Sequence, residues 1–305
     1  LTYISQRLPL NNQVNPALFP SRNVVFLTLP GAGFRLNSPL SYSDIIQTTP
    51  DDSLSHINLN HILGTLCEEG NMGMGADVNL LGFGFKVHRL FVTFNASAHA
   101  AVNIGFPSGL ATLLQEGNYS QSGNDGLLLL GGNLLNATAY STFGLGAGFQ
   151  VTDNITIGAR VKLFNGYFNA TSANTQVRLY TAEDLSSISA DVYYQIRMAG
   201  IASLDDSGHI AMPEFFTPEG KLRWETLLTP NTGVGVDLGA RYESALFDLS
   251  ASVSDLFATI NWSQNVTTLS PANGESHFRF EGIDVSQMIQ GGEIDTNILS
   301  NMTDT

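Results

Sequence analysis

The sequence predicts an all-β protein, an antiparallel transmembrane β-barrel of the outer-membrane type with an N-terminal hatch or plug. Three observations support this prediction: long stretches in which apolar and polar residues alternate, few charged residues, and connections that are either very short or very long. Only 13% of the 305 residues are charged, whereas about 25% is usual in soluble domains. Because the lipid-facing band of a barrel accepts almost no charge, this scarcity favours a membrane protein.

Composition excludes several other classes. The 13 Lys and Arg against 27 Asp and Glu give a net charge of −14, so the chain lacks the basic surface that nucleic-acid binding requires. Its 18 Phe, 9 Tyr and 2 Trp are too many for an acidic disordered chain. No apolar run approaches the ~18 residues of a transmembrane helix. The single cysteine, Cys67, cannot form an internal disulfide, and we interpret it as a buried structural thiol.

Alternation is clearest in residues 90–104, 154–163, 187–198 and 234–242. In the first of these segments every even position is apolar, whereas the odd positions include Asn95, Ser97 and His99. Such segments exceed the ~5–6 residues of an ordinary strand and match the ~9–11 residues that cross a bilayer at a tilt. They favour a barrel, and a soluble β-sandwich is the alternative fold class.

The connections between these segments agree with a barrel. Residues 87–90, 150–155 and 242–245 are tight polar turns, whereas 202–229 is a long stretch with little alternation. Short turns at one rim and long loops at the other are typical of outer-membrane barrels. Aromatic residues near the predicted strand ends fit the girdles of such barrels; they are Tyr140, Phe143, Tyr167, Phe168, Phe257 and Trp262.

The chain is predicted to have two parts. Residues 1–72 contain a first strand and short helical pieces, and we expect them to form a hatch in the barrel lumen; a surface cap is the alternative. Residues 73–305 are expected to supply barrel strands with long extracellular loops. A short helix is also predicted over 108–117, with Ser108 as its cap and Gly117 as its end.

The polar faces of the predicted strands carry charged residues that we expect to face the lumen. Their mixed signs predict cross-strand ion pairs that hold the barrel and its hatch, and a selective path for a solute is the alternative. These residues are Arg160, Lys162, Asp191, Arg197, Asp237, Arg241 and Asp248.

Ser97 and His99 lie two residues apart on one face of one predicted strand, a spacing that would let a serine nucleophile meet its base. Chance produces such a pair easily in a serine-rich chain, and the sequence shows no oxyanion partner. We therefore expect no catalytic residue and no enzymatic activity, with a barrel lipase that uses this pair as a remote alternative. The dispersed histidines indicate no metal site, and no cofactor is expected.

Ordered segments over nearly the whole chain, at 7–17, 34–44, 78–87, 236–240, 249–256, 260–262 and 280–284, resemble an uncharacterised family of Bacteroidota outer-membrane β-barrels. That family is similar to the long-chain fatty-acid transporter barrels and to the barrel subunit of type IX secretion. The resemblance implies a hatch motif at Asn15, Pro16 and Ala17. It also implies that the sequence lacks the closing C-terminal strands, so that residues 73–305 form an incomplete barrel.

The sequence therefore predicts a non-enzymatic outer-membrane β-barrel that serves as an accessory or structural subunit of a larger complex, in secretion, nutrient uptake or barrel assembly. A transporter or channel for a small hydrophobic solute is the alternative. The expected location is the bacterial outer membrane. Expected partners are outer-membrane lipid, lipopolysaccharide and other outer-membrane proteins, and no nucleic acid.

Overall fold

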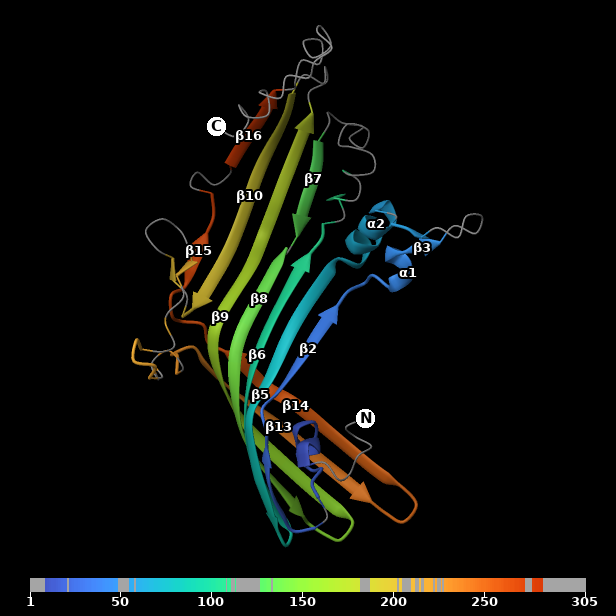
Figure 1. Cartoon of the computed structure of the whole chain (residues 1–305), viewed down its shortest axis with the longest axis vertical. Helices are drawn as coiled ribbons and strands as arrows, with labels where there is room; N and C mark the ends of the chain where they lie inside the picture. The colour runs from blue at the N-terminus through green and yellow to red at the C-terminus, as the bar shows by residue number, and fades with distance from the viewer. Residues whose placement is uncertain are drawn as a thin grey trace.

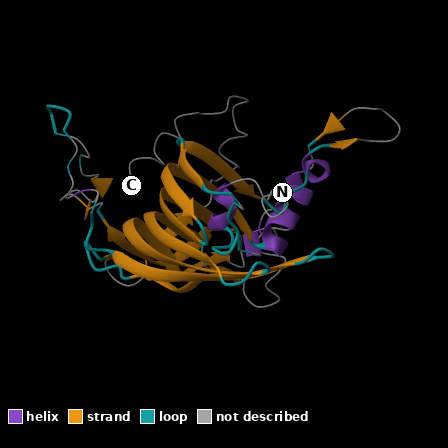
Figure 2. Ribbon diagram, turned by 90° about the horizontal axis from the view of Figure 1, so that it is seen from below, coloured by secondary structure: helices purple, strands orange, loops and turns teal. Residues whose placement is uncertain are grey.

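A computed structural model of the chain describes residues 9–20, 22–48, 55–57, 59–107, 109–110, 113, 127–132, 134–181, 187–201, 203–204, 210–211, 214, 217–221, 223, 226, 228–271 and 276–281. Every strand pairing among them is antiparallel, which confirms the predicted all-β antiparallel class. In this part of the chain the main sheet has 12 strands. It is a curved, open wall that does not close into a barrel (Figures 1 and 2).

Four long strands form the centre of the wall: β5 (Asn71–Val87), β6 (Leu90–Gly105), β8 (Leu135–Gln150) and β9 (Ile155–Thr181). They are hydrogen-bonded in the order of the chain. Tight turns join β5 to β6 and β8 to β9, as predicted at 87–90 and 150–155. β1 (Val24–Thr28) and β2 (Gly31–Asn37) pair one after the other with β5.

The wall divides beyond β8 because two strands share the far edge of β9. The first half of β9 pairs with β13 (Thr232–Glu243), which pairs in turn with β14 (Asp248–Ile260). The second half pairs with β10 (Ser187–Gly200), and β10 also pairs with β15 (Thr267–Leu269) and β16 (Ser276–Glu281). β7 (Leu127–Gly132) pairs with the end of β9. Figure 1 shows the two branches diverging from β9.

Buried polar groups hold the branches together at this fork. Gly166 N donates to the Asn231 carbonyl at 2.7 Å, and Thr229 Oγ1 donates to the Gly166 carbonyl at 2.7 Å. Asn231 Oδ1 accepts a hydrogen bond from Ser263 N at 2.8 Å. The Trp262 indole packs directly over Gly166, where a Cβ would lie 2.6 Å from the ring. These contacts therefore hold the two branches in a fixed position relative to each other.

One face of the wall, called the outer face from here on, is apolar and exposed. Two neighbouring cross-strand rows on it run without a charge from β5 to β14. Leu145 is 62% exposed and Val253 53% exposed. The first row contains Phe83, Phe94, Leu145, Val161, Val236 and Leu256, and the second contains Phe85, Val92, Ala147, Ala159, Leu238 and Val253.

The opposite face, called the inner face, is polar, and its centre is covered. The row between the two apolar rows consists of Gly84, Thr93, Gly146, Arg160 and Asp237. Thr93, Arg160 and Asp237 are all buried. A soluble antiparallel sheet normally buries its apolar face and leaves its polar face in water. This wall has the reverse arrangement.

Helical pieces occur between β2 and β5. α1 (Tyr42–Ile45) follows Ser41, whose N–H donates to Asp44 Oδ2 at 2.7 Å. His61 Nε2, on α2 (Leu59–Glu69), lies 3.0 Å from Asp44 Oδ1. Cys67 is buried in α2. The short hairpin of β3 (Gln47–Thr48) and β4 (Ser55–His56) lies between the two helices in the chain.

Some predicted features fall outside the described residues. The helix expected over 108–117 lies mostly outside them, as do residues 282–305. The long stretch 202–229 is described only in places, which include the hairpin of β11 (Ser203–Leu204) and β12 (Ile210–Ala211). Within the described residues, no helix combines the length and apolar character needed to cross a membrane.

Ser41→Ala is expected to raise the pKa of Asp44. The hydrogen bond from the Ser41 hydroxyl, and then the contact with His61, lower the pKa of the Asp44 carboxyl from 3.8 to about 2. A lowered carboxyl pKa stabilises the fold above the unfolded value, and this stabilisation is lost as the pH falls through the folded value. The contact between α1 and α2 should therefore weaken from about pH 4 to about pH 2.

An NMR titration of the carboxyl carbon of Asp44 measures this pKa. The midpoint should lie near 2 in the parent protein and move toward 3.8 in Ser41→Ala. Ser38→Ala is the control, because the Ser38 hydroxyl accepts from Leu40 N and has no bond to Asp44. A midpoint that stays the same in Ser41→Ala would contradict the assigned cause.

Candidate functional site

The chain segment 9–19, called the N-terminal segment from here on, lies against the inner face of the wall. It begins with the short 3-10 helix η1 (Pro9–Gln13) and contains the predicted motif of Asn15, Pro16 and Ala17. A Cβ atom on Gly158 would overlap the Pro16 carbonyl, and one on Gly239 would overlap the Asn15 side chain. The segment fits because three neighbouring strands, β8, β9 and β13, have glycine at one cross-strand row beneath it, called the glycine row from here on: Gly148, Gly158 and Gly239.

Arg160 and Thr93 hold the first part of this segment. Arg160 Nη1 donates to the Gln13 carbonyl at 3.1 Å, and Arg160 Nη2 donates to the Asn12 carbonyl. Asn12 Nδ2 donates to Thr93 Oγ1 at 2.7 Å. Hydrogen bonds to a charged group contribute about 1.5–3 kcal/mol each. The guanidinium is therefore a main anchor of the segment.

Asn15 holds the second part with both atoms of its amide. Its Nδ2 donates to the Ala251 carbonyl on β14 at 3.2 Å, and its Oδ1 accepts from Ala17 N at 2.9 Å. Ser252 Oγ on β14 also donates to the Val14 carbonyl at 3.2 Å. Asn15 is fully buried. The motif residue predicted from resemblance thus has a specific structural role.

Arg160, Lys162 and Asp237 meet at the centre of the inner face, which brings together three of the predicted lumen charges. Lys162 Nζ lies 2.9 Å from Asp237 Oδ1 and 2.8 Å from Asp255 Oδ1. Arg160 Nη1 lies 3.4 Å from Asp237 Oδ2, and both of these side chains are almost fully buried. Two cations against two carboxylates leave the cluster without net charge. A buried charge is tolerated only when it is paired in this way.

Asp255 is a member of this cluster that alternation along β14 misses. Counting alternate residues from Val253 assigns Asp255 to the outer face. The register against β13 shifts at this place, and Asp255 has a φ of 58°. A β-bulge can re-aim a side chain, and this one turns the Asp255 carboxylate to Lys162. The Asp255 N–H also donates to Asp237 Oδ1 at 2.8 Å.

The other predicted charges lie away from this cluster. Arg241 Nη2 is 2.7 Å from Asp248 Oδ2 across β13 and β14. Asp191 on β10 is hydrogen-bonded to His277 on β16. Arg197 lies on β10, in the other branch of the fork. The seven residues therefore form separate groups and do not line one continuous charged path.

Ser97, His99 and Asp77 form a hydrogen-bonded chain across β5 and β6. Ser97 Oγ lies 2.9 Å from His99 Nε2, and His99 Nδ1 lies 2.6 Å from Asp77 Oδ1. Arg35 Nη2, from β2, lies 3.1 Å from Asp77 Oδ2. The sequence singled out the serine and the histidine and missed Asp77. A register shift in β5 is needed to place Asp77 directly opposite His99.

This hydrogen-bonded chain faces a polar pocket of about 180 Å³ on the inner face. Ser97 and His99 line it together with Asn79 and Asn95, and its far side is formed by Arg160 and Lys162 among others. Asn95 Oδ1 and Arg160 Nε are buried and have no hydrogen-bond partner among the described residues. Both atoms are sealed from solvent, so the polar surface of the pocket comes from the other polar atoms of its lining.

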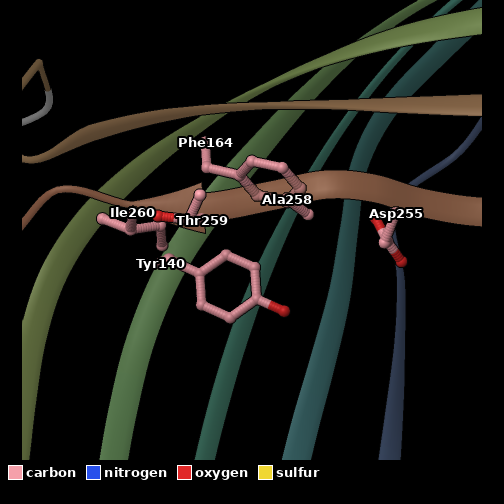
Figure 3. Close-up of a pocket in the computed structure, with 6 residues that line it drawn as sticks. All are labelled: Tyr140, Phe164, Asp255, Ala258, Thr259 and Ile260. Carbon is pink, nitrogen blue, oxygen red and sulfur yellow. The ribbon is translucent and has the colours of Figure 1, made fainter.

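A second pocket of about 200 Å³ adjoins the first, because both are lined by Tyr140, Phe164 and Asp255. Figure 3 shows the Tyr140 ring and the Phe164 ring beside the β14 ribbon, with Ile260 at one end and Asp255 at the other. The Tyr140 ring stacks on the His99 ring, with 5.0 Å between centroids. Aromatic rings thus extend from the histidine into the second pocket.

Residues 16–305 match a sequence family described as a family of unknown function, DUF5723. No curated protein and no solved structure matches the chain. Within the described residues, no group of three or more His, Cys, Asp or Glu side chains is placed to hold a metal ion.

Asp237→Asn is expected to destabilise the protein strongly, because it leaves Arg160 and Lys162 without the carboxylate they share. Removing one partner of a buried ion pair costs about 3–5 kcal/mol, whereas an exposed pair contributes about 0–1 kcal/mol. Asp153→Asn is the matched control, since Asp153 pairs with Arg89 at the surface. Urea unfolding in detergent measures both variants. If both variants lost a similar and small amount of unfolding free energy, this would argue against the structural role of the cluster.

Proposed function

The chain belongs to this family of unknown function, so membership assigns no activity, and we propose a function from the wall itself. The protein supplies a curved part of the wall of an outer-membrane β-barrel, and its N-terminal segment lies on the lumen side of that wall as a hatch. It serves as a structural or accessory subunit of a larger complex in the bacterial outer membrane. The observation that carries this proposal is the reversed polarity of the wall.

The outer face supports a position in lipid. Soluble monomers rarely expose contiguous apolar patches larger than a few hundred Å², yet two complete rows of this face are free of charge across six strands. Residues such as Leu163 and Leu238 are about half exposed. Apolar residues outside and polar residues inside are the pattern of transmembrane barrels. Lipid and lipopolysaccharide would cover this face.

The inner face supports a filled lumen and a structural role. The N-terminal segment occupies the glycine row, and Arg160 and Asn15 bind it to β9 and β14. The central charges neutralise one another. A path for a charged or polar solute would need groups that remain free for that solute. The filled lumen therefore favours an accessory subunit over an open channel.

Leu145→Arg is expected to prevent stable insertion into a membrane. An arginine on the lipid side costs about 2–4 kcal/mol at the bilayer midplane and about 0–1 kcal/mol near the interface. Val151→Arg is the matched control, because Val151 is also exposed but lies in the turn between β8 and β9. Each variant is folded into lipid vesicles, and the fraction of protein that runs as the shifted, folded band on a gel is measured.

Leu145→Arg should lose much more of the folded band than Val151→Arg. Both side chains are exposed in the absence of lipid, so a soluble sheet would tolerate both substitutions. Equal folding of the two variants without detergent or vesicles would overturn the membrane proposal.

The accessory role is tested by purification of the full-length protein from outer membranes in mild detergent. A stable set of co-purifying outer-membrane proteins is the expected result. An isolated monomer that passes a small hydrophobic solute in a planar bilayer would instead favour the transporter alternative. Glu214→Gln, which alters an exposed pair with Arg223 away from the wall, is a suitable control for non-specific loss of partners.

A further inference from the structure

We propose that Ser97 is a nucleophile for acyl transfer from a carboxylic ester, with His99 as its base and Asp77 as the group that orients the base. The proposal goes beyond the structural role of the wall, which needs no chemistry. It also departs from the expectation of a non-enzymatic protein, because the sequence alone did not supply Asp77. The site would accept a neutral ester with a short apolar acyl group.

The two nitrogen atoms of His99 have the partners that this chemistry requires. An ionised Asp77 carboxylate only accepts hydrogen bonds, so the His99 Nδ1 that lies 2.6 Å away must carry the proton. In the neutral imidazole the other nitrogen is then an acceptor. His99 Nε2 therefore accepts from Ser97 Oγ at 2.9 Å. A serine activated by a base that a third group orients is the arrangement of a nucleophilic site.

Asp77 is itself held in place. Its Oδ2 lies 3.1 Å from Arg35 Nη2, so one carboxylate oxygen faces the arginine and the other faces the histidine. The register of β5 and β6 places Asp77 directly opposite His99. Because the three groups lie on paired strands and not on loops, their relative positions are fixed by the hydrogen bonds of the sheet.

Side-chain amides are available to stabilise the oxyanion. Asn79 lies directly opposite Ser97, and Asn95 precedes it by two residues on the same face. Both line the pocket with Ser97. Amide donors placed around a developing oxyanion stabilise the transition state.

The adjoining pocket defines the substrate class. It is lined by the side chains of Tyr140, Phe164, Ala258 and Ile260, and also by Asp255 and Thr259 (Figure 3). The volume of about 200 Å³ suits a short acyl group. Lys162, the cation nearest to Asp255 in this region, is already neutralised by two carboxylates. The pocket therefore selects a neutral ester over an anionic one.

The site lies near the fork of the sheet. In the register of the sheet, His99 lies opposite Tyr140, and Tyr140 lies opposite Gly166 at the fork. The site thus lies where the two branches separate and not at the tight turns of the opposite end.

The reaction proceeds in two balanced steps. Ser97 Oγ attacks the ester carbonyl carbon and gives its proton to His99 Nε2, and the resulting oxyanion collapses with cleavage of the bond to the alkoxy oxygen. His99 returns the proton to that oxygen, so an alcohol leaves and an acyl-serine remains. A water molecule then gives a proton to His99 Nε2 and attacks the acyl carbon. The bond from that carbon to Ser97 Oγ breaks, and His99 returns the proton to Oγ, so a carboxylic acid leaves and Ser97 and neutral His99 are restored.

The test is labelling of the full-length protein in detergent with a fluorophosphonate, combined with hydrolysis of p-nitrophenyl butyrate. We expect covalent label at Ser97, located by mass spectrometry, and no label in Ser97→Ala. His99→Asn and Asp77→Asn should slow both reactions by at least about 100-fold, the usual size of a general-base contribution. Ser141→Ala is the control, because the Ser141 hydroxyl bonds Tyr167 and not a histidine.

Ser97→Cys adds a measurement that does not depend on esterase activity. The His99 base should make this thiol react with iodoacetamide at neutral pH at least about 10-fold faster than in the Ser97→Cys, His99→Asn double variant. A folded parent protein that takes no label at Ser97, together with equal alkylation of both cysteine variants, would overturn the proposal. Neither result bears on membrane insertion, so the proposed structural function is tested separately.

Discussion

The Arg160 guanidinium is the group on which the inner side of the wall depends. It binds a carboxylate on β13 and two carbonyl groups of the N-terminal segment, so one side chain joins three parts of the chain. The glycines on β8 make this possible. Gly144 and Gly146 leave the space through which the arginine side chain extends, since a Cβ on either would touch it. Glycine weakens a strand by itself, but here it lets a buried cation reach its partners.

Alternation predicted strands over 90–104, 154–163, 187–198 and 234–242 and the two faces of each, because side chains point to opposite faces at a period of two. It assigned Arg160, Lys162 and Asp237 to one face, where they indeed meet. It failed where a bulge changes the parity. If the register set by Val87 opposite Leu90 continued, Asp77 would face Ala100, and only the shift in β5 brings it opposite His99. The positive φ of Asp255 has the same effect on β14. The fork was also beyond prediction, because no local pattern shows that two strands share one edge of β9.

The inner face therefore carries two polar clusters that depend on irregular strands: the central cluster of ion pairs, and the hydrogen-bonded chain of Ser97, His99 and Asp77. The two clusters differ in what their polar atoms contact. In the central cluster each carboxylate and each cation forms an ion pair within the protein, so the cluster has no net charge. The series from Arg35 through Asp77 and His99 ends at a hydroxyl that borders a pocket. The central cluster holds the N-terminal segment through Arg160. The hydrogen-bonded chain ends at the Ser97 hydroxyl, which borders a pocket.

In the proposed membrane position, the length of β9 determines how far the sheet would extend beyond the lipid. Its 27 residues span about 90 Å at ~3.3 Å per residue, three times the ~30 Å of a hydrocarbon core. The stretch that pairs with β13, residues 155–165, already has the ~9–11 residues that a tilted crossing needs. In the proposed membrane position, Gly166 under Trp262, with Tyr167 and Phe168 next to it, would lie near the level of the lipid headgroups. The part of β9 beyond that level, where it pairs with β10 and β7, would then extend out of the lipid into water.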